Sequence, residues 1–386
     1  MTTPRREAER VGDLTTPCLL LTESVMRRNI GRLKSRLKSL GVPLRPHLKT
    51  PKCVEIARLL MDTPQGPATV STLREAEVFA DAGVRDMMYA VGIVPSKLDR
   101  VMALRRCGVD LSIVLDSVEA AQAVAERSRA EGAAIPALIE IDSDGHRAGV
   151  RPRDTARLIE IGRTLHAAGA LRGVMTHAGS SYALNTKAAL EAAAEQERAA
   201  AVSCAETLRN FGLPVAIVSV GSTPTAHYAR DLTGITEVRA GNFVFFDLVM
   251  NGVGVCTTDD IAASVLASVI GHQPSNGWIL VDAGWMSLSR DRGTARQTVD
   301  QGYGIVTDTN GKPYRDLIVV EVNQEQGIIA VRPGSNATLP DLPIGTRVRI
   351  LPNHACATAA QHDHYNVIAD QDSDVVTATW RRFAGW

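Results

Sequence analysis

The sequence lacks the features that mark membrane proteins and nucleic-acid-binding proteins. No apolar run reaches the roughly 18 residues that a bilayer-spanning helix needs. Lys plus Arg and Asp plus Glu each number 42, so the formal net charge is zero. No bulk electrostatic field therefore recruits nucleic acid or an anionic membrane. Any anion that this protein binds must be held by a local site.

The sequence also lacks signs of secretion. Met1–Asp13 is charged and has no apolar core, so no secretory signal is expected there. The cysteines are few and scattered, which argues against a disulfide framework and predicts a cytoplasmic protein. Most of them lie in apolar segments, where we expect small buried side chains, with Cys356 as the exception. They are Cys18, Cys53, Cys107, Cys204, Cys256 and Cys356.

The length and composition are those of a globular protein with more than one core. The chain has 386 residues, of which 45% are hydrophobic and 22% charged. This length exceeds one ordinary core and fits a barrel of roughly 250 residues plus a smaller domain. We therefore expect two domains.

Eight short apolar runs alternate with amphipathic, helix-like stretches over most of the chain. Such alternation indicates a parallel sheet, and eight repeats favour an α/β fold closed into a (β/α)8 TIM-type barrel. An open doubly wound sheet is the alternative. Glycines that would end helices, such as Gly83 and Gly212, support the same division. The runs are Val42–Pro46, Ala68–Ser71, Met87–Val91, Leu111–Leu115, Pro136–Ile141, Arg172–Thr176, Val215–Val220 and Glu237–Ala240.

The remaining segments predict a second, β-rich domain. After about Ile261 the helical spacing fades, and Gly, Pro and Asn separate the apolar runs. The run Cys18–Leu21 would be a ninth barrel strand, so we assign it to the second domain. The predicted domains are a barrel over 22–260 and a β-rich domain made of 1–21 and 261–386. The later runs are Ser264–Ile270, Trp278–Val281, Leu317–Glu321, Gly327–Val331 and Arg347–Leu351.

Several candidate site residues lie at the C-terminal ends of the predicted strands, where a barrel gathers its reactive groups. Lys49 ends the first strand, and a lysine there among other cations can lose its proton and attack a carbonyl. Its position alone fits a solvated loop lysine as well, or better. Gly221-Ser222-Thr223 follows the seventh strand and Gly241-Asn242 follows the eighth, the usual barrel position for a phosphate. Gly-Ser-Thr alone could equally be a turn.

Two more polar side chains follow the middle strands. Arg147, after the fifth strand, could donate to a phenolate or carboxylate as a bidentate fork, or form an ordinary loop salt bridge. His177, at the end of the sixth strand, could stack on an aromatic cofactor or be structural. Both residues are candidates for the same strand-end site.

The segment Pro352-Asn353-His354-Ala355-Cys356 follows the last apolar run. Extended residues two apart point to the same face, so His354 and Cys356 could bind one metal ion. An imidazole with a thiolate suits zinc better than magnesium or calcium, and two protein ligands leave positions open for water or substrate. A buried cysteine beside a structural histidine is the alternative. His362 and His364 could be further ligands or part of a solvated turn.

Five motifs follow one another at the predicted strand ends: Arg45–Thr50, Thr176–Gly179, Val218–Thr225, Val281–Gly284 and Pro352–Cys356. Together they resemble the fold-type III pyridoxal-phosphate enzymes, and within these the D-serine dehydratase and D-threonine aldolase group. The resemblance extends over almost the whole chain. It implies an alanine racemase-like barrel, pyridoxal 5'-phosphate, a divalent metal ion, a small-molecule D-amino acid substrate and a homodimer.

The resemblance also implies roles for individual residues. Lys49 would carry the cofactor as a Schiff base, Arg147 would contact its phenolic oxygen, and His177 would lie near its ring. His354 and Cys356 would bind the metal ion, with zinc first and manganese, cobalt or magnesium as alternatives. The residues implied to hold the cofactor are Lys49, His47, Arg147, His177, Tyr182, Gly221, Ser222, Thr223, Gly241 and Asn242.

The reaction that the resemblance implies is elimination. Lys49 would take the α-proton of a D-3-hydroxy amino acid, such as D-threo-3-hydroxyaspartate or D-serine, and the metal ion would help the 3-hydroxyl leave. The products would be a 2-oxo acid and ammonia. The alternative is retro-aldol cleavage to glycine and an aldehyde, although His-x-Cys resembles the dehydratases and His-x-Asp the aldolases. A racemase and a non-catalytic cofactor carrier are further alternatives.

One departure from the resembled pattern concerns substrate choice. Related sequences commonly carry Glu-His-Gly where this chain has Glu325-Gln326-Gly327, and glutamine cannot titrate. A second substrate carboxylate would need a cation. Arg290, Arg292 and Arg296 could supply it, or could be surface charges.

Overall fold

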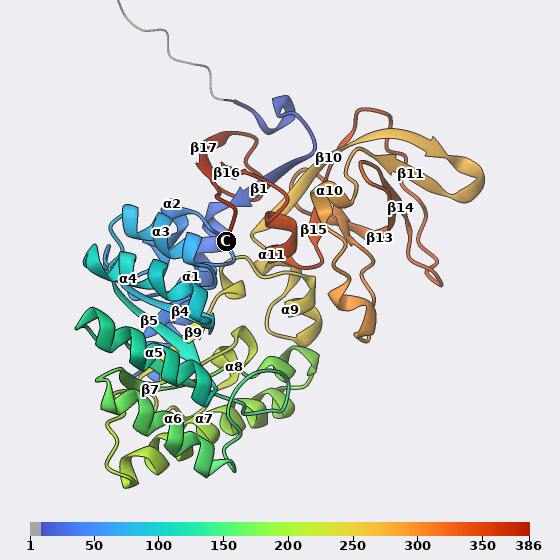
Figure 1. Cartoon of the computed structure of the whole chain (residues 1–386). Helices are drawn as coiled ribbons and strands as arrows, with labels where there is room; N and C mark the ends of the chain where they lie inside the picture. Colours follow the sequence, from blue (N-terminus) through green and yellow to red (C-terminus); the bar gives the residue numbers. More distant parts are fainter. Residues whose placement is uncertain (1–8) are drawn as a thin grey trace, which may run out of the picture. The chain divides into compact units, whose positions relative to one another are not determined.

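Eight parallel strands pair side by side in chain order in the computed structural model, which describes residues 9–386 (Figure 1). The last of them, β9, pairs with the first, β2. A bridge between His47 and Thr69 joins β2 to β3, so the ring is nearly closed. The predicted barrel is confirmed and the open doubly wound alternative is wrong. The strands are β2 (Leu44–Pro46), β3 (Ala68–Val70), β4 (Asp86–Gly92), β5 (Asp110–Leu115), β6 (Ala137–Ile141), β7 (Leu171–Thr176), β8 (Ile217–Val220) and β9 (Glu237–Ala240).

One helix precedes the first of these strands and others connect the successive strands, and their ends follow the sequence signals. Ser117 caps the first turn of α5 with its side chain, and Gly132 ends the same helix with a φ of 64°. Gly83 and Gly212 also have positive φ values and lie between a helix and the next strand. The helices are α1 (Glu23–Ser39), α2 (Val54–Leu60), α3 (Leu73–Asp81), α4 (Leu98–Arg106), α5 (Val118–Glu131), α6 (Thr155–Ala167), α7 (Lys187–Asn210) and α8 (Thr223–Tyr228).

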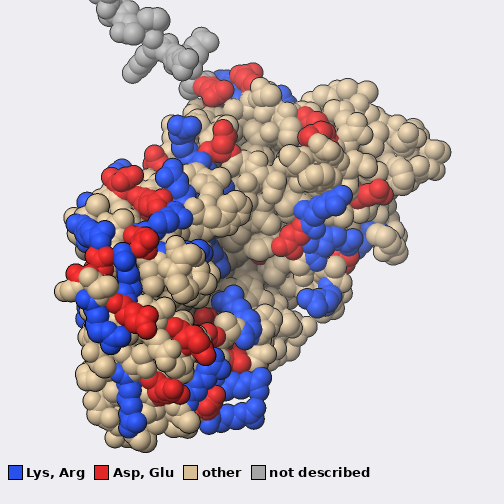
Figure 2. Space-filling view, viewed as in Figure 1, with Lys and Arg blue, Asp and Glu red and all other residues tan. Residues whose placement is uncertain are grey.

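The contacts divide the chain into two units. One comprises 31–243 with 385–386, and the other comprises 244–384 with the N-terminal residues up to 30. The prediction about Met1–Asp13 falls partly on residues 1–8, which lie outside the described residues. In residues 9–386, no helix combines the length and the apolar character needed to cross a membrane. Positive and negative side chains are interspersed over the face drawn in Figure 2, as a zero net charge leads us to expect.

The second unit is built on a nine-stranded sheet that is mostly antiparallel. Strands β10, β11, β14, β13, β12 and β15 pair in a closed circuit, because β11 and β15 both pair with β10. As predicted, the run at Cys18 belongs here, where β1 pairs with β10 and β16. Three strands were not predicted: β12, β16 and β17. The strands are β1 (Cys18–Thr22), β10 (Ala263–Gln273), β11 (Trp278–Val281), β12 (Gly304–Thr307), β13 (Pro313–Val322), β14 (Gly327–Val331), β15 (Arg347–Pro352), β16 (His364–Ile368) and β17 (Val376–Arg381).

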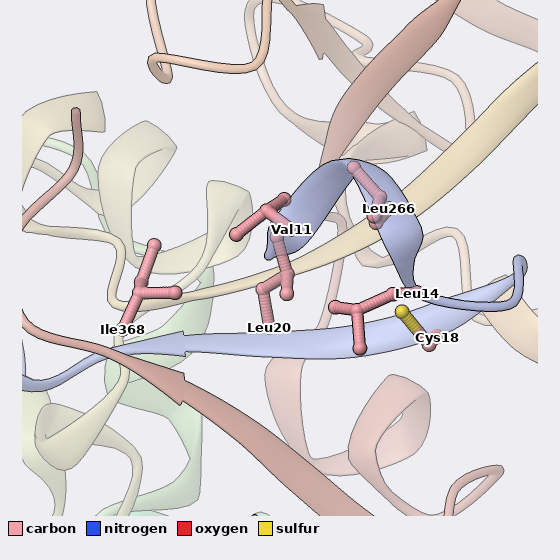
Figure 3. Close-up of a cluster of buried hydrophobic side chains, with 6 residues drawn as sticks. All are labelled: Val11, Leu14, Cys18, Leu20, Leu266 and Ile368. Atoms are coloured by element: carbon pink, nitrogen blue, oxygen red, sulfur yellow. The ribbon is translucent and has the colours of Figure 1, made fainter. Parts of the chain in front are cut away.

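A small apolar cluster holds the N-terminal segment against this sheet (Figure 3). Val11 and Leu14, from the turn η1 (Val11–Asp13) and just after it, pack with Leu20 of β1 and Ile368 of β16. Burying each such side chain contributes about 1.5–3 kcal/mol. The whole cluster is Val11, Leu14, Cys18, Leu20, Leu266 and Ile368.

The cysteines are mostly buried, as predicted, and none of the six is in a disulfide. Cys18, Cys53, Cys204 and Cys256 are buried. Cys107 is exposed, because it occupies the C-cap of α4, where the chain leaves the helix at the surface. Cys356 is partly exposed.

Candidate active site

Lys49 lies in the turn that follows β2, and its side chain is exposed. The turn is fixed from within, because Leu48 is fully buried and its amide donates to the carbonyl of Thr69 at 2.9 Å. Lys52, in the same turn, has a left-handed backbone with a φ of 42°. Its Nζ lies 3.2 Å from Oε1 of Glu75, whose side chain is fully buried. No sequence pattern indicated this ion pair, which anchors the turn that presents Lys49.

Two histidines near Lys49 are held neutral. Nδ1 of His47 donates to the carbonyl of Thr69 at 3.1 Å, and Nδ1 of His177 donates to the carbonyl of Gly221 at 2.9 Å. Burial, followed by the charges of Lys49 and Arg239, holds the pKa of His47 well below its usual value. Burial, followed by the charge of Arg147, lowers the pKa of His177 to about 3. The two neutral histidines therefore lie in a region that the charges of Lys49 and Arg147 make positive.

Arg239, at the buried end of this region, was not predicted. Its Nε donates to Oγ of Ser219 at 2.9 Å, and its Nη2 donates to the carbonyl of Thr176. Burial lowers the pKa of Arg239, although Glu237 and Glu197 act in the opposite direction. Positive charge near the strand ends favours an anionic ligand there.

The loops after β8 and β9 approach other parts of the chain so closely that glycine is favoured at one position in each. Gly221 has a φ of 138°, and a Cβ atom there would lie 2.0 Å from the carbonyl oxygen of Arg239. A Cβ atom on Gly241 would lie 3.0 Å from Cβ and from the carbonyl oxygen of His47. Gly241 thus brings the β9 loop, with Asn242, against the residues that precede Lys49.

The hydroxyl groups of the β8 loop lie in the buried part of the same unit. Oγ of Ser222 accepts from the amide of Thr225 and completes a capping box at the start of α8. Oγ1 of Thr223 is buried and has no hydrogen-bond partner. A buried hydroxyl without a partner is unfavourable unless a ligand or water satisfies it.

Glu197 on α7 braces two of these loops. Oε1 accepts from the amides of Ala178 and Gly221 at 2.9 and 3.0 Å, and Oε2 accepts from Oγ1 of Thr225 at 2.7 Å. Burial raises the pKa of Glu197. It lies in the middle of a long helix, where the sequence offered no signal for its role.

Arg147 and Tyr182 belong to loops that are pinned to each other. The amide of Ser180 donates to Oδ2 of Asp144 at 2.8 Å, which joins the loop after β6 to the loop after β7. Arg147 itself is exposed. Tyr182, in the turn η3 (Gly179–Ala183), has its ring centroid 6.1 Å from that of His177. The predicted cofactor residues of this unit thus lie on adjoining loops at the strand ends.

In the second unit, His354 and Cys356 are in contact, but not for the predicted reason. We predicted extended backbone at both residues. His354 is extended, whereas Cys356 lies in the first turn of α11 (Ala355–Ala359), whose N-cap is His354. Their side chains are hydrogen-bonded to each other. The helix turn, rather than strand alternation, brings the two donor atoms together.

Asp291 lies behind His354 and was not predicted. Nδ1 of His354 donates to Oδ2 of Asp291 at 2.6 Å. Burial opposes protonation of His354, but the hydrogen bonds with Asp291 and Cys356 outweigh it and raise its pKa to about 11. The bond to Asp291 fixes the ring orientation and directs Nε2 away from the carboxylate. Metal-binding histidines commonly have such a carboxylate partner.

Buried polar side chains hold this segment in place. The side-chain amide of Asn353 donates to Oγ1 of Thr294 at 2.8 Å and to the carbonyl of Gly302 at 2.7 Å. Oδ2 of Asp247, the N-cap of α9 (Leu248–Val253), accepts from the amide of Ala355 at 2.9 Å. His354 and Cys356 are therefore presented by a rigid backbone.

The other candidates of this unit either contact other residues or are exposed. The ring of His362 donates to the carbonyl of Ser287, and His364 bonds to Asp363. In residues 9–386, no group of three or more His, Cys, Asp or Glu side chains is arranged to hold a metal ion. Gln326 is exposed in the turn between β13 and β14. Of the three arginines, Arg290 stacks on Trp285, Arg292 pairs with Asp300, and Arg296 is exposed.

Comparison with known proteins assigns the family. The alanine racemase N-terminal domain matches residues 22–249, and a serine dehydratase domain matches residues 262–368. The chain belongs to the alanine racemase family, in the branch with a serine dehydratase domain. This confirms the family predicted from the motifs.

Individual relatives cover almost the whole chain. D-threo-3-hydroxyaspartate dehydratase of Delftia sp. (strain HT23) is 52% identical over 97% of this chain and 98% of its own length. Its solved structure has a TM-score of 0.94, with 51% identity over 98% of this chain and 100% of that one. D-serine dehydratase of Dictyostelium discoideum is 30% identical over 95% of this chain and 96% of its own length.

A D-threonine aldolase is also among the solved structures that this chain resembles. The D-threonine aldolase structure from Filomicrobium marinum has a TM-score of 0.80 and 25% identity, over 98% of each chain. Dehydratases and aldolases are both lyases, so this chain is an enzyme of the lyase class.

Proposed function

We propose that this enzyme is a dehydratase of D-3-hydroxy amino acids, with D-threo-3-hydroxyaspartate as the first substrate to test and D-serine as the second. The contact between His354 and Cys356, backed by Asp291, carries the proposal together with the 52% identity to a dehydratase. Pyridoxal 5'-phosphate and a divalent metal ion would be its cofactors. The products would be a 2-oxo acid and ammonia.

The barrel residues fit a phosphorylated cofactor. The unpartnered hydroxyl of Thr223 needs a ligand, and Gly221 and Gly241 make loops without side chains where an anion can meet backbone amides. Pyridoxal phosphate, when bound, supplies the electron sink for carbanion chemistry. Ser222 and Asn242 would complete the phosphate site. Lys49, His47, Arg147, His177 and Tyr182 would surround the remainder of the cofactor.

The second unit offers a donor pair that fits a soft divalent ion. His354 provides a nitrogen oriented by Asp291, and Cys356 provides a sulfur beside it. The ion, when bound, supplies Lewis acidity for a departing hydroxyl. In solved structures of D-threo-3-hydroxyaspartate dehydratase, a cysteine-to-alanine variant is in a metal-free form, and a histidine-to-alanine variant changes a residue two positions away. The spacing is that of His354 and Cys356, and zinc is the ion we propose first.

The residues of the chain divide the work of elimination between them. Lys49 would take the proton from Cα, since an uncharged amine is a competent base. His177, uncharged at neutral pH, would present Nε2 to the site without adding positive charge, because its Nδ1 is committed to Gly221. His354 and Cys356 would hold the ion that assists the hydroxyl.

Retro-aldol cleavage is the second candidate, favoured by the aldolases among the relatives. One is 3-hydroxy-D-aspartate aldolase of Paracoccus denitrificans, at 25% identity over 92% of this chain. The dehydratases match at up to 52%. The resemblance further supports a homodimer and a cytoplasmic location as proposals.

The assay that tests the proposal follows ammonia release by protein supplied with pyridoxal phosphate and zinc. Lys49→Ala should reduce the rate by several orders of magnitude. Lys38→Ala, at an exposed lysine of α1, is the matched control and should retain the rate. Wild-type turnover by Lys49→Ala protein would contradict both the dehydratase and the aldolase assignments.

A further inference from the structure

A cavity of about 280 Å³ in the second unit contains charged residues that the proposed reaction does not use. Its walls come from residues 10–13, from Thr309 and Asn310, from β15 and from residues 372–374. Two arginines of β15, Arg347 and Arg349, lie two positions apart and therefore on one face of the strand.

Arg349 is a buried cation at this cavity. It is 2% exposed, and its Nε atom has no hydrogen-bond partner. Nη1 of Arg347 is likewise buried without a partner, while its Nη2 donates to the carbonyl of Gly12 at 3.3 Å. Burial lowers the pKa of Arg349 to about 10, against the charge of Asp308. Buried guanidinium nitrogens that lack partners are unfavourable unless a ligand supplies acceptors.

The aspartates that line the cavity lie at the surface, away from the buried guanidinium atoms of Arg347 and Arg349. Asp13, Asp372 and Asp374 are exposed, and Asp374 pairs with Arg10. Water and salt screen such exposed carboxylates, whereas the buried guanidinium is screened much less. The interior of the cavity therefore favours an anion even though three arginines and three aspartates line it.

The wall opposite β15 is held in a defined position. The amide of Val11 donates to the carbonyl of Asp374 at 2.7 Å. Val11 also belongs to the apolar cluster of Figure 3, which fixes η1 on the sheet. The cavity is therefore bounded by anchored backbone.

We propose that this cavity binds a small oxyanion, the carboxylate or phosphate group of a small molecule, through Arg347 and Arg349. Guanidinium groups form paired hydrogen bonds with both kinds of group. Binding here is independent of the proposed reaction, since it uses none of the residues assigned to the cofactor or the metal ion.

Thermal unfolding of the cofactor-loaded enzyme tests the proposal, with inorganic phosphate or acetate added at an ionic strength held constant with sodium chloride. We expect a saturable rise in Tm of about 2 °C or more with at least one of the anions. Arg349→Met should abolish the rise. Arg381→Met, at an exposed arginine of β17 outside the cavity, should retain it. Without added anion, Arg349→Met should be at least as stable as wild type, because it removes a buried cation whose Nε atom has no hydrogen-bond partner.

The two anions distinguish the ligand chemistry. A rise with phosphate alone indicates a phosphorylated ligand, and a rise with acetate alone indicates a carboxylate. If Arg349→Met does not fold, Arg347→Met takes its place and should weaken the response at least several-fold. No rise beyond sodium chloride in wild type, or a rise undiminished in the folded arginine variant, overturns the proposal.

Discussion

Nδ1 of His354 lies 2.6 Å from Oδ2 of Asp291, and the two residues are 63 positions apart in the chain. The bond leaves Nε2 as the ring nitrogen that can reach a ligand. Carboxylates in this position orient a metal-binding histidine and increase its basicity. A hydrogen bond between two residues distant in the sequence thus orients the ring as the proposed metal site requires.

We expect Asp291→Asn to weaken metal binding about 10- to 100-fold, because the amide neither carries the charge nor orients the ring in the same way. Competition with a chelator, followed by metal analysis of the protein, measures the change. Asp341→Asn, at an exposed aspartate of the same unit, is the control and should leave affinity unchanged. Equal affinities in all three proteins would show that Asp291 has no part in the site.

The ion pair between Lys52 and Glu75 should contribute to stability and to the presentation of Lys49. Glu75→Gln leaves a mostly buried lysine without its partner, which typically costs about 3–5 kcal/mol. Glu77→Gln, on the same helix but in a more exposed pair with Arg100, should cost about 1 kcal/mol or less. Denaturant unfolding gives both values. Similar losses for the two variants would contradict the assigned role.

Gly221→Ala should impair cofactor binding, because its Cβ atom would lie 2.0 Å from a backbone carbonyl. Cofactor retention on dialysis, followed by absorbance, measures the effect, which we expect to exceed tenfold. Gly212→Ala is the control: its φ is 74°, but a Cβ atom there meets nothing within 4 Å. That change should cost about 1–2 kcal/mol of stability and leave retention intact. Full retention by Gly221→Ala would exclude the proposed phosphate loop.

The buried histidines predict a loss of stability in acid. The pKa of His177 is about 3 in the folded protein and near 6.5 when unfolded, so the unfolded state binds the extra proton between these values. The contribution of neutral His177 to the free energy of unfolding is therefore complete above pH 6.5. It is lost as the pH falls towards 3, by up to about 1.4 kcal/mol per pH unit. His177→Gln should flatten this part of the unfolding profile, whereas His166→Gln, at an exposed residue, should not. An unchanged slope in His177→Gln would contradict the burial argument.

The barrel could be predicted because buried parallel strands leave continuous apolar runs, and all eight were found. Strands β12 and β17 were missed for a physical reason. β12 has only four residues, and β17 alternates partly buried and exposed positions without a strong apolar face. A strand that is short, or that has no strongly apolar face, resembles a loop in a sequence.

The candidate site could be predicted where strand ends or motifs mark it, as at Lys49 and His354. Glu75, Glu197 and Asp291 could not, because each is an ordinary polar residue of a helix or loop until the fold brings its partner close. The contact of His354 with Cys356 was predicted from strand alternation but arises from the first turn of α11. The residue types at these two positions thus indicated that the side chains meet, whereas the backbone conformation that brings them together was predicted wrongly.

Product analysis tests the proposed function most directly. The enzyme is incubated with D-threo-3-hydroxyaspartate, D-serine and D-threonine before chelation, after chelation and after zinc is restored. We predict a 2-oxo acid and ammonia from at least the first substrate, with activity lost on chelation and recovered with the metal ion. Glycine and an aldehyde as the products would contradict the dehydratase assignment and make this chain an aldolase.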